Sequence, residues 1–334
     1  MPTTMYGDLN PEIAGAFASD ILEAAAPQVI MGRFCQSETL PEQSTQLMNF
    51  IRYVPVDSEP DNLQLGEDVS SAGKKLESEN IQMRCSLYGD HIKLTDTQLR
   101  MGFSHVRTWA GKIMSRQAVE LSEKIVLNAI KAGTSVVYAN GTARSAVNSV
   151  ATSVHLNAVI EALVKANAPR VTSQKNPAKE YATEPVRASY MALLPPELIA
   201  GARALSGFID ARKYSTPSEF GSFEIGAYND IRFLSHSLLT RFTDLGATGG
   251  TNVRQDATTS KAFVYPIIVF AEEAFAQVAL GGDFAVTPYY VEPKPQVSDP
   301  NAQIGLVGWK SYRTAGILQD LYIARIETAA PSNI

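Results

Sequence analysis

Few residues of this sequence are of types that do chemistry, and their spacing does not bring them together. The four histidines are scattered along the chain, at His91, His105, His155 and His236. None stands at metal-ligand spacing from a Cys, Asp or Glu, and no HExxH pair occurs. Cys35 and Cys85 form neither a metal pattern nor a disulfide framework, which favours a reducing compartment. The sequence therefore predicts no metal site and no cofactor.

Two short patterns resemble catalytic motifs but lack the context that those motifs need. Ser71-Ala-Gly-Lys74 matches the S-x-x-K of penicillin-recognising serine enzymes, which place the serine at the start of a helix. Here the pattern falls in a polar loop. The glycine run 246–250 fits neither a P-loop nor a dinucleotide fingerprint, and no Gly-Lys-Ser/Thr follows it. We assign no catalytic residue and do not expect an enzyme.

Charged residues gather in the polar stretch 55–80. The acidic ones are Asp57, Glu59, Asp61, Glu67 and Asp68. Their spacing lacks the regular pattern of a calcium loop, so a solvated charge run is the better interpretation. Lys74 and Lys75 follow them at the expected tip of a hairpin and are candidates for salt bridges to a neighbouring subunit. Each exposed pair of this kind contributes only about 0.2–1 kcal/mol.

Composition indicates a folded, soluble protein. The chain has 334 residues, of which 45% are hydrophobic and 19% charged, enough for two domains or one large one. The formal net charge of -5 argues against a basic nucleic-acid footprint. The first residues lack the pattern of a secretory signal, and no apolar run approaches the ~20 residues of a membrane span. We expect a cytosolic protein when made, with no membrane partner.

The first hundred residues read as a helix followed by a projecting hairpin. Asn10 and Pro11 suit a helix start, and Ile13, Phe17 and Ile21 recur at helical spacing, so we expect a helix over 10–26. Strands are expected at 46–54 and at 81–87, where Ile81, Met83, Cys85 and Leu87 alternate with polar residues. The long polar stretch between them is unusual within a compact domain.

One long helix dominates the next segment. Thr95 with Gln98 forms a capping-box pattern, and Gly133 suits the other end, with no proline between. We expect a single uninterrupted helix that acts as a structural spine. A hairpin is expected around Asn140-Gly141. Further helices are expected at 153–167 and after Pro195, a mobile loop at 246–260, and strands at 261–270, 284–293, 305–318 and 320–328.

The order of these elements resembles the HK97-like fold of tailed-phage major capsid proteins, an α+β fold. Residues across nearly the whole chain are similar to the pattern of the N4-like podovirus capsid family. They are Thr172-Ser173-Gln174, Tyr181-Ala-Thr-Glu-Pro185-Val186, Ser189-Tyr190, Phe220-Gly221-Ser222, Asp230-Ile231-Arg232-Phe233, Pro300, Gly308-Trp309-Lys310 and Gly316-Ile317-Leu318. These motifs are structural, so the resemblance implies fold and assembly and carries over no catalytic residue.

The resemblance also implies a division of the chain. Residues 1–45 would be the N-terminal arm, 46–95 the E-loop hairpin, 96–150 the P-domain with the spine helix, 151–260 the A-domain and 261–334 the return strands of the P-domain. The segment 171–234, rich in aromatics, prolines and glycines without any chemistry, would then shape loops around a symmetry axis. Candidate intersubunit contacts are Glu67, Asp68, Lys74, Lys75 and Trp309.

The implied function is a structural shell protein of the virion, assembled in the host cytoplasm from hexamers and pentamers of this chain. It would enclose double-stranded DNA without sequence-specific binding. A separate scaffolding protein, a portal and a decoration protein are the expected partners. An encapsulin-like nanocompartment shell, which shares the fold, is the nearest alternative. A soluble α/β enzyme or ligand-binding protein is the other alternative, and it would need a concave site that the sequence does not show.

Overall fold

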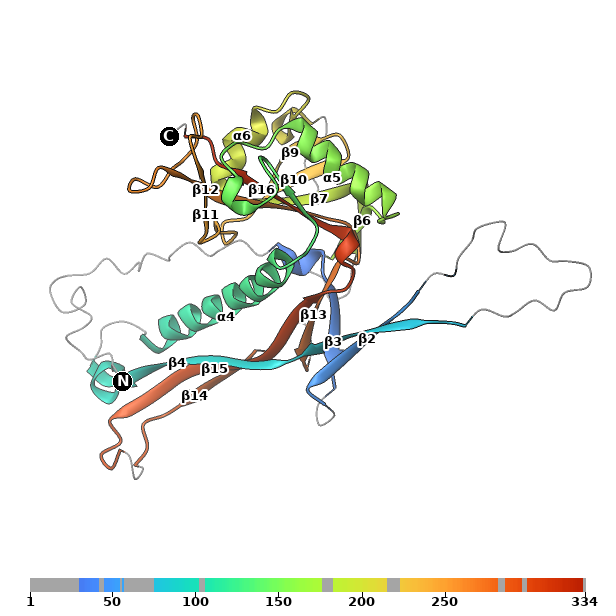
Figure 1. The fold of residues 1–334 in the computed structure, drawn as a ribbon. Helices are drawn as coiled ribbons and strands as arrows, with labels where there is room; N and C mark the ends of the chain where they lie inside the picture. Colours follow the sequence, from blue (N-terminus) through green and yellow to red (C-terminus); the bar gives the residue numbers. More distant parts are fainter. Residues whose placement is uncertain are drawn as a thin grey trace, which may run out of the picture.

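The computed structural model describes residues 30–41, 45–54, 56, 75–101, 106–175, 183–214, 223–281, 286–295 and 299–332. Three parts are visible in Figure 1: a compact body, an elongated part built of one long helix and long strands, and a projecting hairpin. The body contains a nine-stranded sheet, the elongated part a five-stranded sheet, and the hairpin is a two-stranded sheet of its own. The expected helix at 10–26 lies outside the described residues.

The sheet of the body has the order β5-β16-β12-β7-β10-β9-β8, with β11 paired to β12 and β6 to β7. Its strands are β5 Val136–Tyr138, β6 Val171–Lys175, β7 Thr183–Leu194, β8 Ile209–Asp210, β9 Glu224–Tyr228, β10 Ile231–Ser235, β11 Leu245–Thr248, β12 Lys261–Phe270 and β16 Ile323–Ala329. β10 runs parallel to β7 and β16 parallel to β5, and the other pairs are antiparallel.

The central strands of this sheet are buried on both faces, because alternate side chains enter two different cores. Tyr190, Ala192 and Leu194 of β7 belong to one core, which the helices α5 (Ser153–Lys165) and α6 (Ile199–Arg203) cover. Met191 and Leu193 belong to the other, which includes residues of the long helix and of the 3-10 turn η2 (Met31–Arg33). The second core therefore joins the body to the elongated part.

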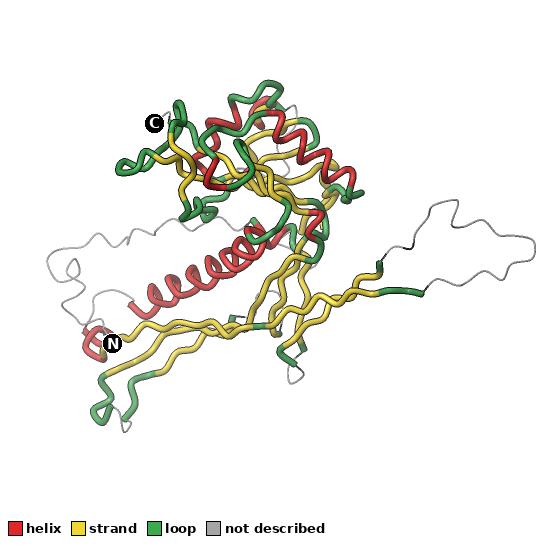
Figure 2. Tube along the Cα trace, viewed as in Figure 1, coloured by secondary structure: helices red, strands yellow, loops and turns green. Residues whose placement is uncertain are grey.

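The sheet of the elongated part is arranged around β15, its longest strand. The order is β1-β13-β15-β14, and β4 pairs with β15 along most of its length. The strands are β1 Gln36–Leu40, β4 Ser86–Thr95, β13 Phe275–Leu280, β14 Thr287–Val291 and β15 Ile304–Ile317. Figure 2 shows β4, β14 and β15 running side by side below the long helix. Residues 261–334 thus supply strands to both sheets, so the expected segment boundaries do not follow the sheets.

The structure has two helices where one uninterrupted helix was predicted, α3 (Asp96–Met101) and α4 (Val106–Lys131). The capping box is confirmed, since Gln98 N donates to Thr95 Oγ1 and Thr95 N donates to Gln98 Oε1. The residues between the helices, 102–105, lie outside those described, and they include Gly102, whose helix propensity is about 1 kcal/mol below that of alanine. At 1.5 Å per residue α4 is about 39 Å long.

The hairpin is confirmed, with β2 (Leu47–Tyr53) antiparallel to β3 (Ser78–Arg84). The predicted strand 81–87 is wrong at its end, because the chain breaks at Cys85 and continues as β4 in the other sheet. Met83 and Cys85 are buried as predicted, whereas Leu87 is 56% exposed. Pairing of Leu87 with Tyr312 of β15 replaces the continuation of the hairpin. Residues 57–74 of its tip are outside the described residues.

Two other predictions need correction, and two are confirmed. Gly141 has a φ of +68°, as a turn residue should, but the 3-10 turn η3 (Arg144–Ala146) follows it and no hairpin forms. The reason is that β5 pairs with β16 instead. Part of 246–260 is strand β11, not a loop. The helix at 153–167 is α5, and Pro196 begins the 3-10 turn η4 (Pro196–Leu198) that leads into α6.

Candidate assembly surface

The residues that could do chemistry stay apart or are used in the fold. Within the described ranges no three His, Cys, Asp or Glu residues gather as a metal site. His155 belongs to the capping box of α5, His236 is buried, and His91 is exposed on β4. Burial raises the pKa of the Cys85 thiol, which makes this cysteine a poor nucleophile. His105 and the Ser71–Lys74 pattern lie outside the described residues.

The hairpin packs one of its faces against the elongated part at its root. Met48 and Phe50 of β2 and Ile81 of β3 pack on a small core made of Leu40, Met83, Cys85, Ala276 and Val278. In the register, Met48 faces Met83 and Phe50 faces Ile81. Further out, Arg52 forms an ion pair with Glu79 across the strands. The subunit's own core therefore covers only the root of this face.

The opposite face of the hairpin is uncovered, and it carries large apolar side chains from β2 beside polar side chains from β3, to which they are paired. Because side chains alternate along a strand, Leu47, Ile51 and Tyr53 share the face that points away from Phe50. They are 39%, 64% and 61% exposed. Val56 and Leu76 beyond them are 51% and 64% exposed. An isolated two-stranded hairpin is only marginally stable in water, so a partner surface would stabilise this one.

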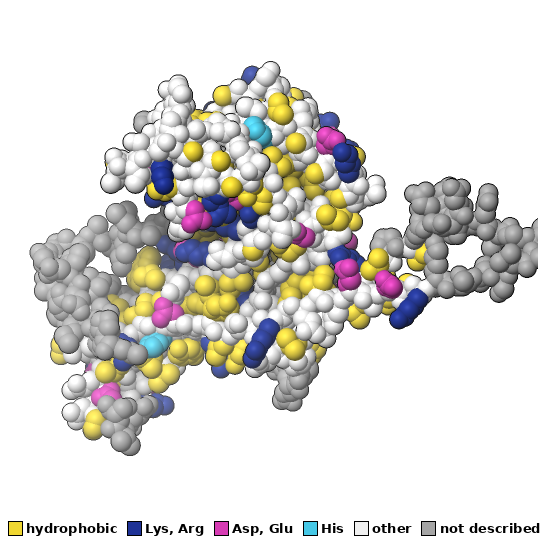
Figure 3. All heavy atoms as spheres, in the orientation of Figure 1, with side chains coloured by type: hydrophobic (Ala, Val, Ile, Leu, Met, Phe, Trp, Pro, Cys, Tyr) yellow, Lys and Arg dark blue, Asp and Glu magenta, His cyan; other side chains and the backbone are white. Residues whose placement is uncertain are grey.

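The long helix is fixed to the elongated sheet by packing and by a chain of hydrogen bonds. Ala110, Met114 and Ala118 of α4 pack on a core that includes Leu94, Val307 and Trp309. Trp309 Nε1 donates to Gln117 Oε1 at 3.1 Å, and Gln117 Nε2 donates to Asp90 Oδ2 at 2.6 Å. The bond from Gln117 holds the pKa of Asp90 below its usual value. On the face in Figure 3, hydrophobic side chains gather over this region.

Of the candidates for contacts between subunits, Trp309 lies in the interior of this chain. Its side chain is 4% exposed and lies between the sheet and α4, so within this subunit it is a core residue. Glu67, Asp68 and Lys74 lie outside the described residues. Lys75 is exposed just before β3, next to Leu76. The contacts of all five candidates to a neighbour stay a prediction.

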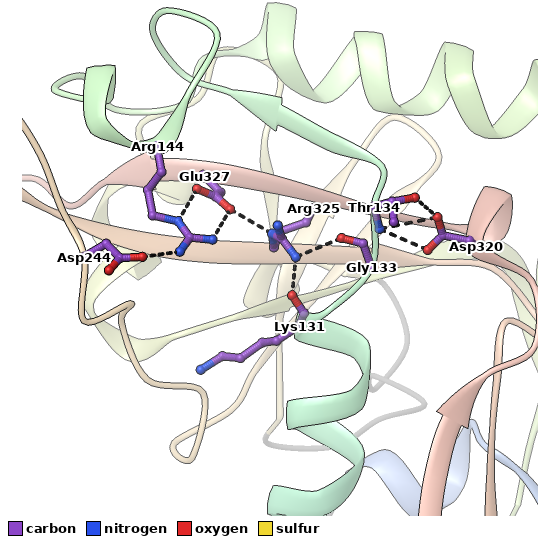
Figure 4. Close-up of polar contacts among 8 residues, drawn as sticks. All are labelled: Lys131, Gly133, Thr134, Arg144, Asp244, Asp320, Arg325 and Glu327. Atoms are coloured by element: carbon purple, nitrogen blue, oxygen red, sulfur yellow. Dashed lines mark hydrogen bonds and ion pairs between the residues drawn. The ribbon is translucent and has the colours of Figure 1, made fainter. Parts of the chain in front are cut away.

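A second cluster joins the C-terminal end of α4 to the sheet of the body (Figure 4). Arg325 of β16 donates to the carbonyl oxygens of Lys131 and Gly133 and to Glu327 Oε1. Glu327 is fully buried and also accepts two bonds from Arg144, at 2.8 and 2.9 Å. The bonds from Glu327 raise the pKa of Arg144. The carbonyl groups at the C-terminal end of α4 carry partial negative charge, and they accept hydrogen bonds from the guanidinium of Arg325.

Beside this cluster, Thr134 at the start of the next segment donates to Asp320 from its backbone N and its hydroxyl. Asp320 begins the 3-10 turn η7 (Asp320–Tyr322), which leads into β16. Arg144 also pairs with Asp244 at 2.7 Å, and its guanidinium lies 3.7 Å from the centroid of Phe242. Polar contacts that involve β16, η7 and Asp244 therefore stabilise the junction between α4 and the body.

A third contact fixes the point at which the N-terminal segment enters the structure. Glu123 of α4 is 3% exposed and accepts from the backbone N of Met31 at 3.1 Å. His236, fully buried just after β10, lies 2.9 Å from the same carboxylate oxygen through Nε2. Its Nδ1 accepts from Leu238 N, so Nε2 carries the proton and donates to Glu123. One carboxylate thus joins three separate segments.

The sequence did not predict two polar clusters, that of Arg325 with Glu327 and that of Glu123 with His236. It also did not predict the exposed face of the hairpin. The face had a readable signal, because 47–53 alternates while both of its faces carry large apolar residues. A strand of a self-sufficient two-layer domain needs only one apolar face. The polar clusters had no such signal, since Glu123 and His236 are separated by more than a hundred positions. Nothing local distinguishes them from surface residues.

No protein-family model matches the sequence, and no curated protein matches it significantly. Solved structures do match the fold. The capsid of Ralstonia phage GP4 is 12% identical over 100% of this chain and 99% of that chain, with a TM-score of 0.67. The capsid of cyanophage P-SCSP1u is 14% identical over 98% and 96%, at 0.62. The head of Helicobacter pylori bacteriophage KHP40 is 12% identical over 99% and 98%, also at 0.62.

These likenesses extend over whole chains, and their low identities restrict them to the fold. The mixture of helices and strands, the long helix on an elongated sheet and the projecting hairpin fit the HK97-like fold expected from the sequence. In the described residues no helix is long and apolar enough to cross a membrane. This chain has the fold of bacteriophage capsid proteins.

Proposed function

We propose that this chain is the major capsid protein of a tailed, double-stranded-DNA phage. It would assemble as hexamers and pentamers into an icosahedral shell around the packaged genome. The observation that carries the proposal is the hairpin, which projects beyond the core of its own subunit and exposes the large apolar side chains Leu47, Ile51 and Tyr53 on one face. In a closed shell every such face meets a neighbour, since each subunit repeats the same contact by symmetry.

Further surfaces would serve the remaining contacts of the subunit. On α5, Val154 and Val164 are 70% and 50% exposed, and Ile209 of β8 is 53% exposed. These residues lie within 151–260, the segment that we propose as the axial A-domain. The E-loop would be the segment 46–95, which includes the hairpin, and the P-domain would be 96–150 together with 261–334. Each contact in such assemblies buries about 1,200–2,000 Å² or more, and every subunit makes several.

The partners follow from this role. We propose a separate scaffolding protein during assembly, a portal at one vertex and a decoration protein on the outside, with assembly in the host cytoplasm and the virion as the final location. The net charge of -5 fits a wall that encloses DNA without gripping it. The similarity of the sequence motifs to the N4-like family makes a podovirus of that kind the proposed source.

Charge on the exposed face of the hairpin tests the proposal. Ile51→Asp places a carboxylate on a residue that is 64% exposed, so the subunit should fold normally. In an assembled shell the same residue would be buried, where an apolar side chain contributes about 1.5–3 kcal/mol and an unpaired charge opposes burial. We expect no closed shells, or shells that dissociate at clearly lower temperature, by electron microscopy and thermal scanning.

Leu321→Asp is the matched control, because Leu321 is also 64% exposed but lies in η7, away from the hairpin. Shells of Ile51→Asp with the stability of the wild type would refute the role of the hairpin. The contents of the shells decide between two shell functions. Nuclease-resistant DNA supports the capsid, whereas a co-purifying enzyme without DNA supports an encapsulin-like compartment.

A further inference from the structure

The strands β4, β14 and β15 form a part of the elongated sheet that α4 covers on one face only. Leu94, Val307 and Trp309 pack with the helix, and Figure 1 shows α4 on this one side of the strands. Side chains alternate along a strand, so the residues between them point to the other face. In the register these are the odd-numbered residues of β4 and β14, from Leu87 to Thr95 and from Thr287 to Val291, and the even-numbered residues of β15 from Ile304 to Tyr312. We call this surface the open sheet face.

The open sheet face carries large apolar side chains that are exposed. Leu87 is 56% exposed, Val291 is 37% exposed, and Tyr289 and Ile304 are each 36% exposed. A sheet of a globular domain normally buries its apolar side chains against a second layer. Here α4 provides that layer on one side, and among the described elements none provides it on the other. A surface of this kind marks an interaction site.

The open sheet face carries two lysines, Lys93 and Lys310, and a histidine, His91, and it has no Asp or Glu. The ammonium groups of both lysines have no ion pair or hydrogen bond with a residue that the structure describes. Asp90 is next to His91 in the sequence, but its side chain belongs to the other face, where it accepts from Gln117. A partner of the open sheet face should therefore supply carboxylates as well as apolar side chains.

The spacing and the shape of the face favour an extended occupant. Lys93 is paired with Leu306, four residues from Lys310, so the two lysines are about 14 Å apart along the strands. An extended segment has the same distance between side chains i and i+4, which share one of its faces. Between the lysines β15 contributes Gly308, where a Cβ would lie 2.6 Å from Tyr289 Oη. The ring of Tyr289 therefore lies against Gly308, and the middle of the face is flat.

The area of the face argues for a segment and against a second subunit. From Ile304 to Tyr312 the face is about 27 Å long, and three strands that lie about 4.8 Å apart make it about 14 Å wide. This area is on the order of 400 Å², whereas each partner in a stable interface buries about 800 Å². An extended segment of about eight residues would cover it.

The charges also argue against a second copy of this chain as the occupant. Two open sheet faces that met would bring lysines against lysines. On the exposed face of the hairpin, Arg84 is the one charged side chain among the residues of β2 and β3. On α4 and α5, the carboxylates of Glu120 and Glu161 are already paired with lysines of the same helices. Contact between surfaces of like charge is unfavourable, so these surfaces do not complement the open sheet face.

We propose that the open sheet face binds an extended segment of a separate protein, about eight residues long, in which acidic and apolar side chains alternate on one face. Its carboxylates would pair with Lys93 and Lys310, and its apolar side chains would cover Leu87, Tyr289 and Ile304. The inference goes beyond the proposed shell function, because it concerns a different protein and its test measures peptide binding and not assembly.

A synthetic peptide that repeats Glu-Thr-Leu-Thr twice tests the proposal, because Glu and Leu alternate on one of its faces. Fluorescence anisotropy measures its binding to the full-length protein, and the same peptide with Lys in place of Glu is the control probe. We expect the wild type to bind the acidic peptide and not the basic one. In Lys93→Glu/Lys310→Glu the affinity for the acidic peptide should fall at least about tenfold, and the basic peptide should bind instead. Lys213→Glu/Lys261→Glu, with the same change of charge at exposed positions of the body, should bind like the wild type.

A wild type that binds both peptides equally, or neither, overturns the proposal, and so does a charge-reversal variant that still prefers the acidic peptide. A DNA duplex that binds through Lys93 and Lys310 while the acidic peptide does not bind overturns it in favour of nucleic acid. If the charge-reversal variant forms no rings or shells while Lys213→Glu/Lys261→Glu forms them, the face is a contact between subunits and the proposal is wrong.

Lys93→Gln/Lys310→Gln keeps the test decisive if the glutamates disturb folding. This variant removes both positive charges and adds no negative ones, so it should fold like the wild type and bind the acidic peptide more weakly. Binding of the acidic peptide that is unchanged in this variant contradicts the proposal.

Discussion

At the residue scale, the chemistry-bearing side chains of this protein serve structure. Glu123 and His236 would attract attention as an acid–base pair in an enzyme, yet both are buried and their bonds connect α4, the entry of the chain and the loop after β10. The charged groups of Arg144, Arg325 and Glu327 likewise form hydrogen bonds with one another and with the C-terminal end of α4. Buried ion pairs are costly when one partner is removed.

His236→Ala tests this interpretation. The substitution leaves the carboxylate of Glu123 buried without its imidazole donor, so we expect a loss of about 1–3 kcal/mol in the free energy of unfolding of the unassembled subunit. His91→Ala is the control, because that side chain is exposed on β4, and it should change stability by less than about 0.5 kcal/mol. Equal stability of the two variants in chemical denaturation would show that the pair contributes nothing.

These residues also mark the limit of sequence reading at this scale. The sequence around His236 did not show whether its imidazole is buried, because its partner Glu123 lies on another element and the pair leaves no local pattern. The capping box of Thr95 and Gln98 was readable because both partners lie within one turn. The packing of Trp309 against α4 left no local pattern either, since only the tertiary fold places α4 over β15.

At the element scale, periodicity located most strands and helices but not their partners. The hairpin β2–β3, α5, β12 and β15 follow from alternation and helical spacing. The break at Cys85 and the pairing of β5 with β16 do not, because each is decided by a strand far away in the sequence. The close approach of β4 to β15 is likewise decided by a strand far away in the sequence. It requires glycines at the points where the two backbones are closest.

A pair of glycine substitutions tests that approach. A Cβ at Gly89 would lie 2.7 Å from the backbone oxygen of Trp309, so Gly89→Ala must push β4 and β15 apart. We expect it to destabilise the subunit by about 1–3 kcal/mol. Gly111→Ala has open space and should stabilise α4 by up to about 1 kcal/mol. Thermal unfolding compares the two variants, and a Gly89→Ala as stable as Gly111→Ala would contradict the tight packing.

At the scale of the whole molecule, the described parts form a subunit that is incomplete by itself. The central strands of the body are buried on both faces of their sheet, whereas the hairpin extends from its root beyond the core that it packs on (Figure 1). The proposed capsid function would explain this asymmetry, because closed symmetry would supply a neighbouring surface for the hairpin. The resemblance of the sequence motifs predicted that fold, and composition alone did not.

The central claim is that this chain builds a closed shell from copies of itself. Negative-stain electron microscopy of the purified full-length protein tests it most directly, over a range of protein concentrations. The account predicts uniform shells, or hexameric and pentameric rings in which the hairpin of one subunit lies on the next. A folded protein that stays a monomeric globule at every concentration, with no rings and no shells, would contradict it.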